Sequence, residues 1–212
     1  MIRTLRIVGL VAGLTALTVQ FVLTMIDSTA AGRSVVGSII FYFSFFTILT
    51  NMLVVVAYGG SLTAQPAFFR RPSVRAGIAV AIAVVAIVYW MLLRGLHDLG
   101  GLRQVCNVLL HYVAPPVYLA WWLIACADGS TRWRDVLWWL VYPFAYLAYT
   151  LARAPLAGEV PYPFLDFAAN GVRAVVVSGV TIAGLFVVLG VIAVAADHAI
   201  GARRARFSGI RQ

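Results

Sequence analysis

Long apolar stretches, separated by short polar or Pro/Gly-containing connections, dominate this chain. Six of them come close to or exceed the about 20 residues that an α-helix needs to cross a bilayer. They cover residues 5–26, 36–59, 74–93, 104–126, 135–152 and 172–196. No connection is long enough to hold a soluble domain, and no internal repeat is evident. The pattern predicts an all-α polytopic membrane protein, in which residues 1–212 form one domain, a bundle of six transmembrane helices.

Composition agrees with this class of protein. Hydrophobic residues make up 63% of the chain, charged residues only 11%, and the mean hydropathy is +0.96. These values are far from those of a soluble domain. The apolar run near the N-terminus is too long for a cleavable signal peptide, so residues 5–26 are expected to stay as the first span. Every basic residue is an arginine, which favours a GC-rich, bacterial source.

The arginines predict the orientation in the membrane. An even number of spans puts both termini on one side. Five arginines fall on the opposite side (Arg33, Arg94, Arg103, Arg153 and Arg173), which leaves 11 of the 16 on the side of the termini. The positive-inside rule then places both termini in the cytoplasm of a multi-pass plasma-membrane protein. The net charge of +9 therefore reports topology, and no basic soluble region exists to bind nucleic acid.

A polar stripe interrupts the second apolar stretch. In "FYFSFFTILTN", Ser44, Thr47 and Asn51 are spaced three and four residues apart, with Thr50 beside them. This spacing places the first three on one face of a helix, and Thr47 falls near the middle of the bilayer. One interpretation is that these side chains tie helices together by hydrogen bonds. The other is that they line a site.

The fourth apolar stretch contains His111, the only histidine predicted inside the bilayer. It lies about 10 Å from the outer boundary, and Asn107 lies one turn above it on the same face. An ionisable group at this depth faces the bundle or a cavity and is a functional candidate. The alternative is a neutral histidine that braces the helix. Pro115 and Pro116 follow, and their missing N–H groups predict a kink that opens a pocket.

Thr47 and His111 together predict acyl-transfer chemistry. A histidine within hydrogen-bond reach accepts the proton of a threonine hydroxyl and activates the oxygen as a nucleophile. At the outer face, Asp166 in "VPYPFLD" is expected near the mouth of the pocket, although capping of the sixth helix explains it equally well. Arg94 is also expected near this mouth, and His97 and Asp98 belong to the same outer loop, where solvated side chains are the rule.

Three motifs in this order resemble a known family. "FFTILTN", "HYVAPP" and "YPFLD" are similar to segments of the androgen-induced membrane hydrolases, which hydrolyse fatty acid esters of hydroxy fatty acids. The resemblance extends over residues 36–196 and implies a bacterial six-helix relative. It implies a catalytic pair of Thr47 and His111. One difference is that Thr50 stands where the family has an acidic residue, so the substrate can differ.

Two functions follow as alternatives. The first is an intramembrane lipid-ester hydrolase with a membrane lipid or fatty-acyl substrate. The second is a non-catalytic protein that binds or transports a lipid or small molecule. No cofactor or metal is expected, because the chain has no paired metal-ligand motif. The expected pocket has the catalytic pair Thr47 and His111 and the substrate-binding residues Asn51, Asn107, Arg94 and Asp166.

Overall fold

The computed structural model describes residues 2–96 and 99–209; His97 and Asp98 lie outside the described residues. The chain is 85% helical, and the described ranges hold no strand, so the all-α prediction is confirmed. The α-helices are α1 (Ile2–Ala30), α2 (Val35–Phe43), α3 (Phe46–Thr63), α4 (Pro72–Val88), α5 (Gly101–Val108), α6 (Ala114–Ala125), α7 (Asp135–Trp139), α8 (Val141–Ala157) and α9 (Phe167–Gly209). Two π-helical turns, η2 (Tyr89–Leu93) and η3 (Leu109–Val113), extend α4 and join α5 to α6. Two short 3₁₀ turns are η1 (Ala67–Arg70) and η4 (Pro163–Leu165).

Five helical stretches of the described chain are long and apolar enough to cross a membrane. They are Ile2–Ala30, Phe46–Thr63, Pro72–Leu93, Gly101–Ala125 and Phe167–Arg206. Several long apolar helices of this kind mark a membrane protein. The predicted span 135–152 falls on α7 and α8, which are not among these five.

The second predicted span, 36–59, is not one continuous helix. Helix α2 ends at Phe43, and Phe45 has an extended backbone (φ −90°, ψ 125°) before α3 begins. Side chains replace the helical partners here: the Tyr146 hydroxyl donates to the Ser44 carbonyl at 2.9 Å, and Ser44 Oγ donates to the Ile40 carbonyl at 2.6 Å. Buried backbone groups that leave a helix need such partners in an apolar surrounding. The break therefore puts a helix N-terminus inside the bundle.

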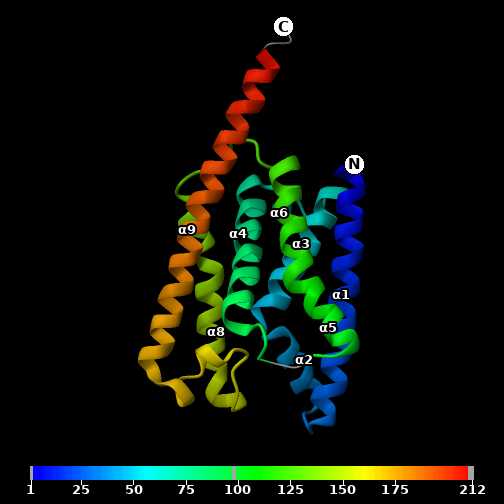
Figure 1. The fold of residues 1–212 in the computed structure, drawn as a ribbon, viewed down its shortest axis with the longest axis vertical. Coiled ribbons are helices and arrows are strands. Elements are labelled where there is room, and N and C mark those ends of the chain that lie inside the picture. The colour runs from blue at the N-terminus through cyan, green and yellow to red at the C-terminus, as the bar shows by residue number, and fades with distance from the viewer. Residues whose placement is uncertain (1, 97–98, 210–212) are drawn as a thin grey trace.

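Helix α4 lies in the middle of the bundle, with α9 and α8 on one side and α6, α3 and α1 on the other (Figure 1). Its residues from Ala79 to Ile82 are at most 2% exposed. Close packing continues at α1, where a Cβ added to Gly9 would lie 2.7 Å from the Tyr58 ring. Glycine at this position lets α1 approach α3, as small residues do between membrane helices.

The outward surfaces are apolar, as lipid contact requires. Leu137 and Trp138 on α7 are 70% and 71% exposed, and Val180 on α9 is 68% exposed. Both termini lie at one end of the bundle, and α9 extends beyond it (Figure 1). The opposite end, which we call the outer end, carries the α1–α2 and α8–α9 connections.

Candidate active site

Thr47 occupies the first turn of α3, directly after the break. The first intrahelical bond of α3 runs from the Leu49 amide to the Phe45 carbonyl at 3.1 Å, so the Thr47 amide has no helical acceptor. That amide instead donates to the Tyr162 hydroxyl at 3.2 Å. Thr47 is 8% exposed, and its hydroxyl is held at a helix N-terminus, where partial positive charge accumulates.

His111 faces the Thr47 hydroxyl from η3. The distance from His111 Nε2 to Thr47 Oγ1 is 3.3 Å, and His111 Nδ1 lies 3.0 Å from the Asn107 carbonyl oxygen. A carbonyl oxygen only accepts hydrogen bonds, so Nδ1 carries the proton in this contact. Nε2 of the neutral ring is then left with its lone pair toward Thr47. The tautomer is the one that a general base needs.

The wide turn around His111 has a cause in the sequence. The Ala114 amide donates to Leu109, five residues back, and Pro115 has no N–H for the preceding turn. The Leu110 carbonyl finds its donor on another helix, the side-chain amide of Asn51 at 3.3 Å. The same amide donates to the Thr47 carbonyl at 2.9 Å. Asn51 therefore joins the turns that carry the two candidate catalytic side chains.

Tyr89 fixes the plane of the imidazole. It begins η2, and its ring stacks on His111 with centroids 3.9 Å apart and an interplanar angle of 27°. The Asn107 side-chain amide donates to the Tyr89 hydroxyl at 2.6 Å. Asn107 thus holds His111 through its carbonyl and Tyr89 through its amide. π-helical turns recur at functional sites, and here two of them meet.

Tyr162 is the third side chain at Thr47, and the sequence patterns did not single it out. Its hydroxyl lies 3.3 Å from Thr47 Oγ1, in addition to accepting from the Thr47 amide. The ring is buried and stacks on Phe164 with an interplanar angle of 5°. The sequence signal that could have identified Tyr162 is its position between two prolines in an otherwise apolar part of the loop. Prolines stiffen a loop enough to hold a side chain inward.

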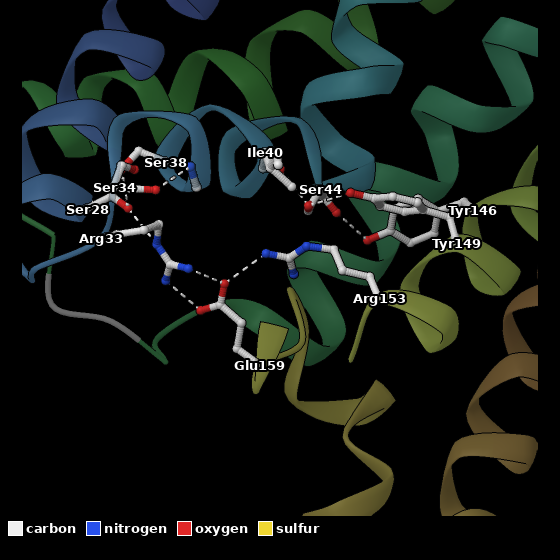
Figure 2. Close-up of polar contacts among 11 residues, drawn as sticks. Ser28, Arg33, Ser34, Ser38, Ile40, Ser44, Tyr146, Tyr149, Arg153 and Glu159 are labelled. Atoms are coloured by element: carbon white, nitrogen blue, oxygen red, sulfur yellow. Dashed lines mark hydrogen bonds and ion pairs between the residues drawn. The ribbon is translucent and has the colours of Figure 1, made fainter. Parts of the chain in front are cut away.

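An ion-pair cluster ties the Tyr162 loop to the rest of the outer end (Figure 2). Glu159 accepts two hydrogen bonds from Arg33, both at 2.7 Å, and one from Arg153 at 2.9 Å. Burial alone would raise the pKa of the Glu159 carboxyl, but the two guanidinium groups lower it below its ordinary value. The carboxylate is ionised at neutral pH and connects the α1–α2 connection to the α8–α9 loop.

Two cavities meet at Thr47. The wider one has a volume of about 510 Å³ and runs from Thr47 and His111 to Asp27, Arg33 and Arg103 at the outer end. Asp27 and Arg103 form an ion pair across this mouth. The narrower one, about 70 Å³, lies between α4, α8 and α9. Thr47, Leu93 and Tyr162 line both cavities.

The predicted site residues divide into two groups. Thr47, Asn107 and His111 line the wider cavity together. Asn51, which was expected to line it as well, is not among its lining residues, and neither are Arg94 and Asp166, which were expected near its mouth.

Asn51 lies behind Thr47, because its amide is engaged by the backbone carbonyls of Thr47 and Leu110. Arg94 lies over the Trp90 ring, 5.6 Å from its centroid, in a cation–π contact. Asp166 caps α9 through the amides of Ala168 and Ala169 at 2.9 and 3.1 Å, as the alternative interpretation stated.

The remaining polar residues of the stripe join helices. Ser44 Oγ lies 2.9 Å from the Tyr149 hydroxyl, and Thr50 Oγ1 lies 3.0 Å from the Tyr142 hydroxyl. Cys106 and Cys126 are buried free thiols. The described part of the chain has no group of three or more His, Cys, Asp or Glu side chains placed to hold a metal ion.

Comparison with known proteins found no relative of this chain. No protein-family model matches the chain, and neither a curated protein nor a solved structure matches it.

Proposed function

We propose that this protein is an intramembrane lipid-ester hydrolase, with Thr47 as nucleophile and His111 as general base. The observation that carries the proposal is the row Thr47 Oγ1, His111 Nε2, His111 Nδ1 and Asn107 O, with contacts of 3.3 and 3.0 Å, at the wall of a cavity. Fatty acid esters of hydroxy fatty acids, or similar lipids, are the substrates that the resemblance of the three motifs implies.

In the acylation step, Thr47, His111 and Asn107 each have a distinct role. His111 Nε2 takes the proton from Thr47 Oγ1 as this oxygen attacks the ester carbonyl carbon. The Asn107 carbonyl, which accepts from Nδ1–H, steadies the imidazolium that forms. Nε2 then returns the proton to the leaving alkoxide oxygen as the C–O bond breaks, which releases an alcohol and leaves an acyl-Thr47 ester.

Tyr162 supplies a donor for the negative charge on the carbonyl oxygen. Its hydroxyl oxygen accepts from the Thr47 amide and lies 3.3 Å from Thr47 Oγ1, so its proton can turn from that oxygen to the substrate carbonyl. Burial raises the pKa of Tyr162 above its ordinary value, a shift that its hydrogen bonds with Thr47 only partly offset, so the hydroxyl stays protonated at neutral pH. A fixed donor at the developing oxyanion is commonly worth about 10²-fold or more in kcat.

Deacylation repeats the sequence with water. A water molecule from the wider cavity gives a proton to His111 Nε2 and attacks the acyl carbon. Nε2 then protonates Thr47 Oγ1 as the acyl bond to threonine breaks, which releases a fatty acid and restores the resting site. The cavity reaches the charged outer end, so water has a route that does not cross the apolar bundle.

The proposal includes a topology. The segment of α7 and α8 forms the fifth of six spans, both termini are cytoplasmic, and the site opens to the outer side of the plasma membrane. The arginine distribution supports this orientation. In a background without Cys106 and Cys126, a maleimide that cannot cross membranes should label Thr29→Cys on intact cells and spare Ser130→Cys. Both positions are exposed in the fold, so labelling of Ser130→Cys alone would reverse the orientation.

The decisive test compares two threonines of α3. A long-chain ester and a fluorophosphonate label are offered to the purified wild type, Thr47→Ala and Thr50→Ala. Thr50 is also buried and hydrogen-bonded, but its partner is Tyr142 and it lines neither cavity. We expect Thr47→Ala to lose turnover and labelling while Thr50→Ala keeps both. Full turnover by folded Thr47→Ala would leave the second function, a non-catalytic lipid-binding protein, whose polar residues join helices.

A further inference from the structure

The two cavities at Thr47 differ in the chemistry of their walls. The narrow one, which we call the slot, is lined by apolar side chains, such as Val84 and Val88 of α4 and Ile182 of α9, apart from the hydroxyls of Thr47, Tyr146 and Tyr162. The wider cavity has polar and charged groups along it, from Gln20 to the Asp27–Arg103 pair. An ester bound at Thr47 has two halves to place, and the walls offer two different environments.

The position of His111 determines which half of the ester lies in which cavity. It lines the wider cavity and does not line the slot. The base must return its proton to the leaving alkoxide, so the alcohol half has to be on the side of His111. After the alcohol departs, water must occupy the same side to be activated by the same nitrogen. The acyl chain, which stays on Thr47 between the two steps, is left with the slot.

The slot also reaches the surface of the bundle. Phe144 of α8 lines it and is 52% exposed, and on the other side it is bounded by Gly179 of α9. A surface of this kind, on apolar helices, faces lipid tails. An unbranched acyl chain already dissolved in the bilayer matches the apolar lining of such an opening.

Resting on the proposed hydrolase function, we propose that the slot between α4, α8 and α9 binds the acyl chain of the ester, and that the wider cavity binds the alcohol half. The substrate class is then an ester with a long, unbranched acyl chain that enters sideways from the lipid. The alcohol leaves through the wider cavity toward the outer end. The slot sets selectivity for the acyl half, and the wider cavity sets selectivity for the alcohol.

Two glycines of α9 provide a matched test. A Cβ added at Gly179 lies 3.4 Å from Leu147 Cδ2, an ordinary contact, so Gly179→Leu fills the slot. A Cβ added at Gly184 has no neighbour within 4 Å, and Gly184 is exposed, so Gly184→Leu points into lipid. Both changes raise helix propensity equally. Ala183→Leu, which also lies in the slot, serves as a second variant if Gly179→Leu does not fold.

The substrates are methyl palmitate, with a long acyl chain, and hexadecyl acetate, with a long alcohol. We expect Gly179→Leu to lower kcat/KM for methyl palmitate by about tenfold or more and to leave hexadecyl acetate unchanged. Gly184→Leu should change neither. Selective loss of hexadecyl acetate, equal loss of both, or no loss in either slot variant overturns the assignment of the acyl chain. Turnover that survives Thr47→Ala, or a wild type inactive on both esters, overturns the proposed function and this assignment with it.

Discussion

A threonine and a histidine meet at both ends of the bundle, and the two pairs differ in what they can do. At the outer end, Thr47 Oγ1 faces His111 Nε2 beside a cavity. At the end that holds the termini, His198 Nε2 lies 2.7 Å from the Thr131 carbonyl, and Thr131 Oγ1 donates to Asp197 Oδ2 at 2.7 Å. Neither of the two cavities includes this second cluster.

The comparison shows that residue types in contact do not define a site. His198 Nε2 donates its proton to the Thr131 carbonyl, so this nitrogen has no lone pair directed at Thr131. The Thr131 hydroxyl donates to the Asp197 carboxylate. Asp197 also accepts from the Asp128 and Thr131 amides at 2.8 and 3.0 Å, which fastens the α6–α7 loop to α9. The inner cluster is a closed set of partners. The outer pair keeps one acceptor nitrogen and empty space in front of it.

Replacing each histidine with glutamine should therefore affect a different property, activity for His111 and stability for His198. The loss of activity is the largest effect expected. His111→Gln keeps a hydrogen-bonding group but cannot take a proton, so ester hydrolysis should fall by about 10³-fold or more while the protein still folds. His198→Gln should lower the melting temperature and leave turnover per folded molecule unchanged.

The double variant Thr47→Ala/His111→Gln should be little worse than either single variant, because residues that act as one unit are strongly non-additive. The measurement is hydrolysis in detergent with a thermal melt for each protein. An active, folded His111→Gln protein would make the outer pair another structural contact, like the inner one.

Tyr162 should have the next largest effect. Tyr162→Phe removes the donor to the carbonyl oxygen and keeps the packing of the ring, so kcat should fall by about 10²-fold with KM little changed. The matched control is Tyr149→Phe, which removes a hydroxyl that contacts only Ser44 Oγ among the contacts described above. Steady-state kinetics on one long-chain ester separates kcat from KM. Equal, small losses in both variants would reduce Tyr162 to a packing residue.

The smallest effect concerns Glu159 and pH. Its folded-state pKa lies below the ordinary value, so the ionised cluster stabilises the fold above the unfolded pKa of about 4.3. That contribution is lost as the pH falls through the folded-state value. Melting curves between neutral pH and this acidic range should show wild type converging on Glu159→Gln, which begins less stable. A constant difference between the two proteins at every pH would exclude the carboxylate as the cause.

The sequence predicted much of this architecture because apolar length is a local property. Helical stretches over the predicted spans, the cap at Asp166 and the pairing of Thr47 with His111 all follow from spacing along single helices and from depth in the bilayer. The break at Ser44 and Phe45 could not be read from the pattern. It depends on a hydroxyl from Tyr146, about a hundred residues away in the chain, which replaces a helical donor.

The sequence alone determined that the chain is a bundle of apolar helices and marked Thr47 and His111 as the candidate catalytic side chains, since hydrophobicity and residue type need no partner. The tertiary structure alone decided the rest of the site. It brought Tyr162 and Tyr89 against that pair, engaged Asn51 and Asp166 with backbone groups, set Arg94 over Trp90, and divided the space at Thr47 in two. Each of these outcomes depends on atoms from separate helices competing for the same few hydrogen bonds and the same volume, and no single segment encodes that competition.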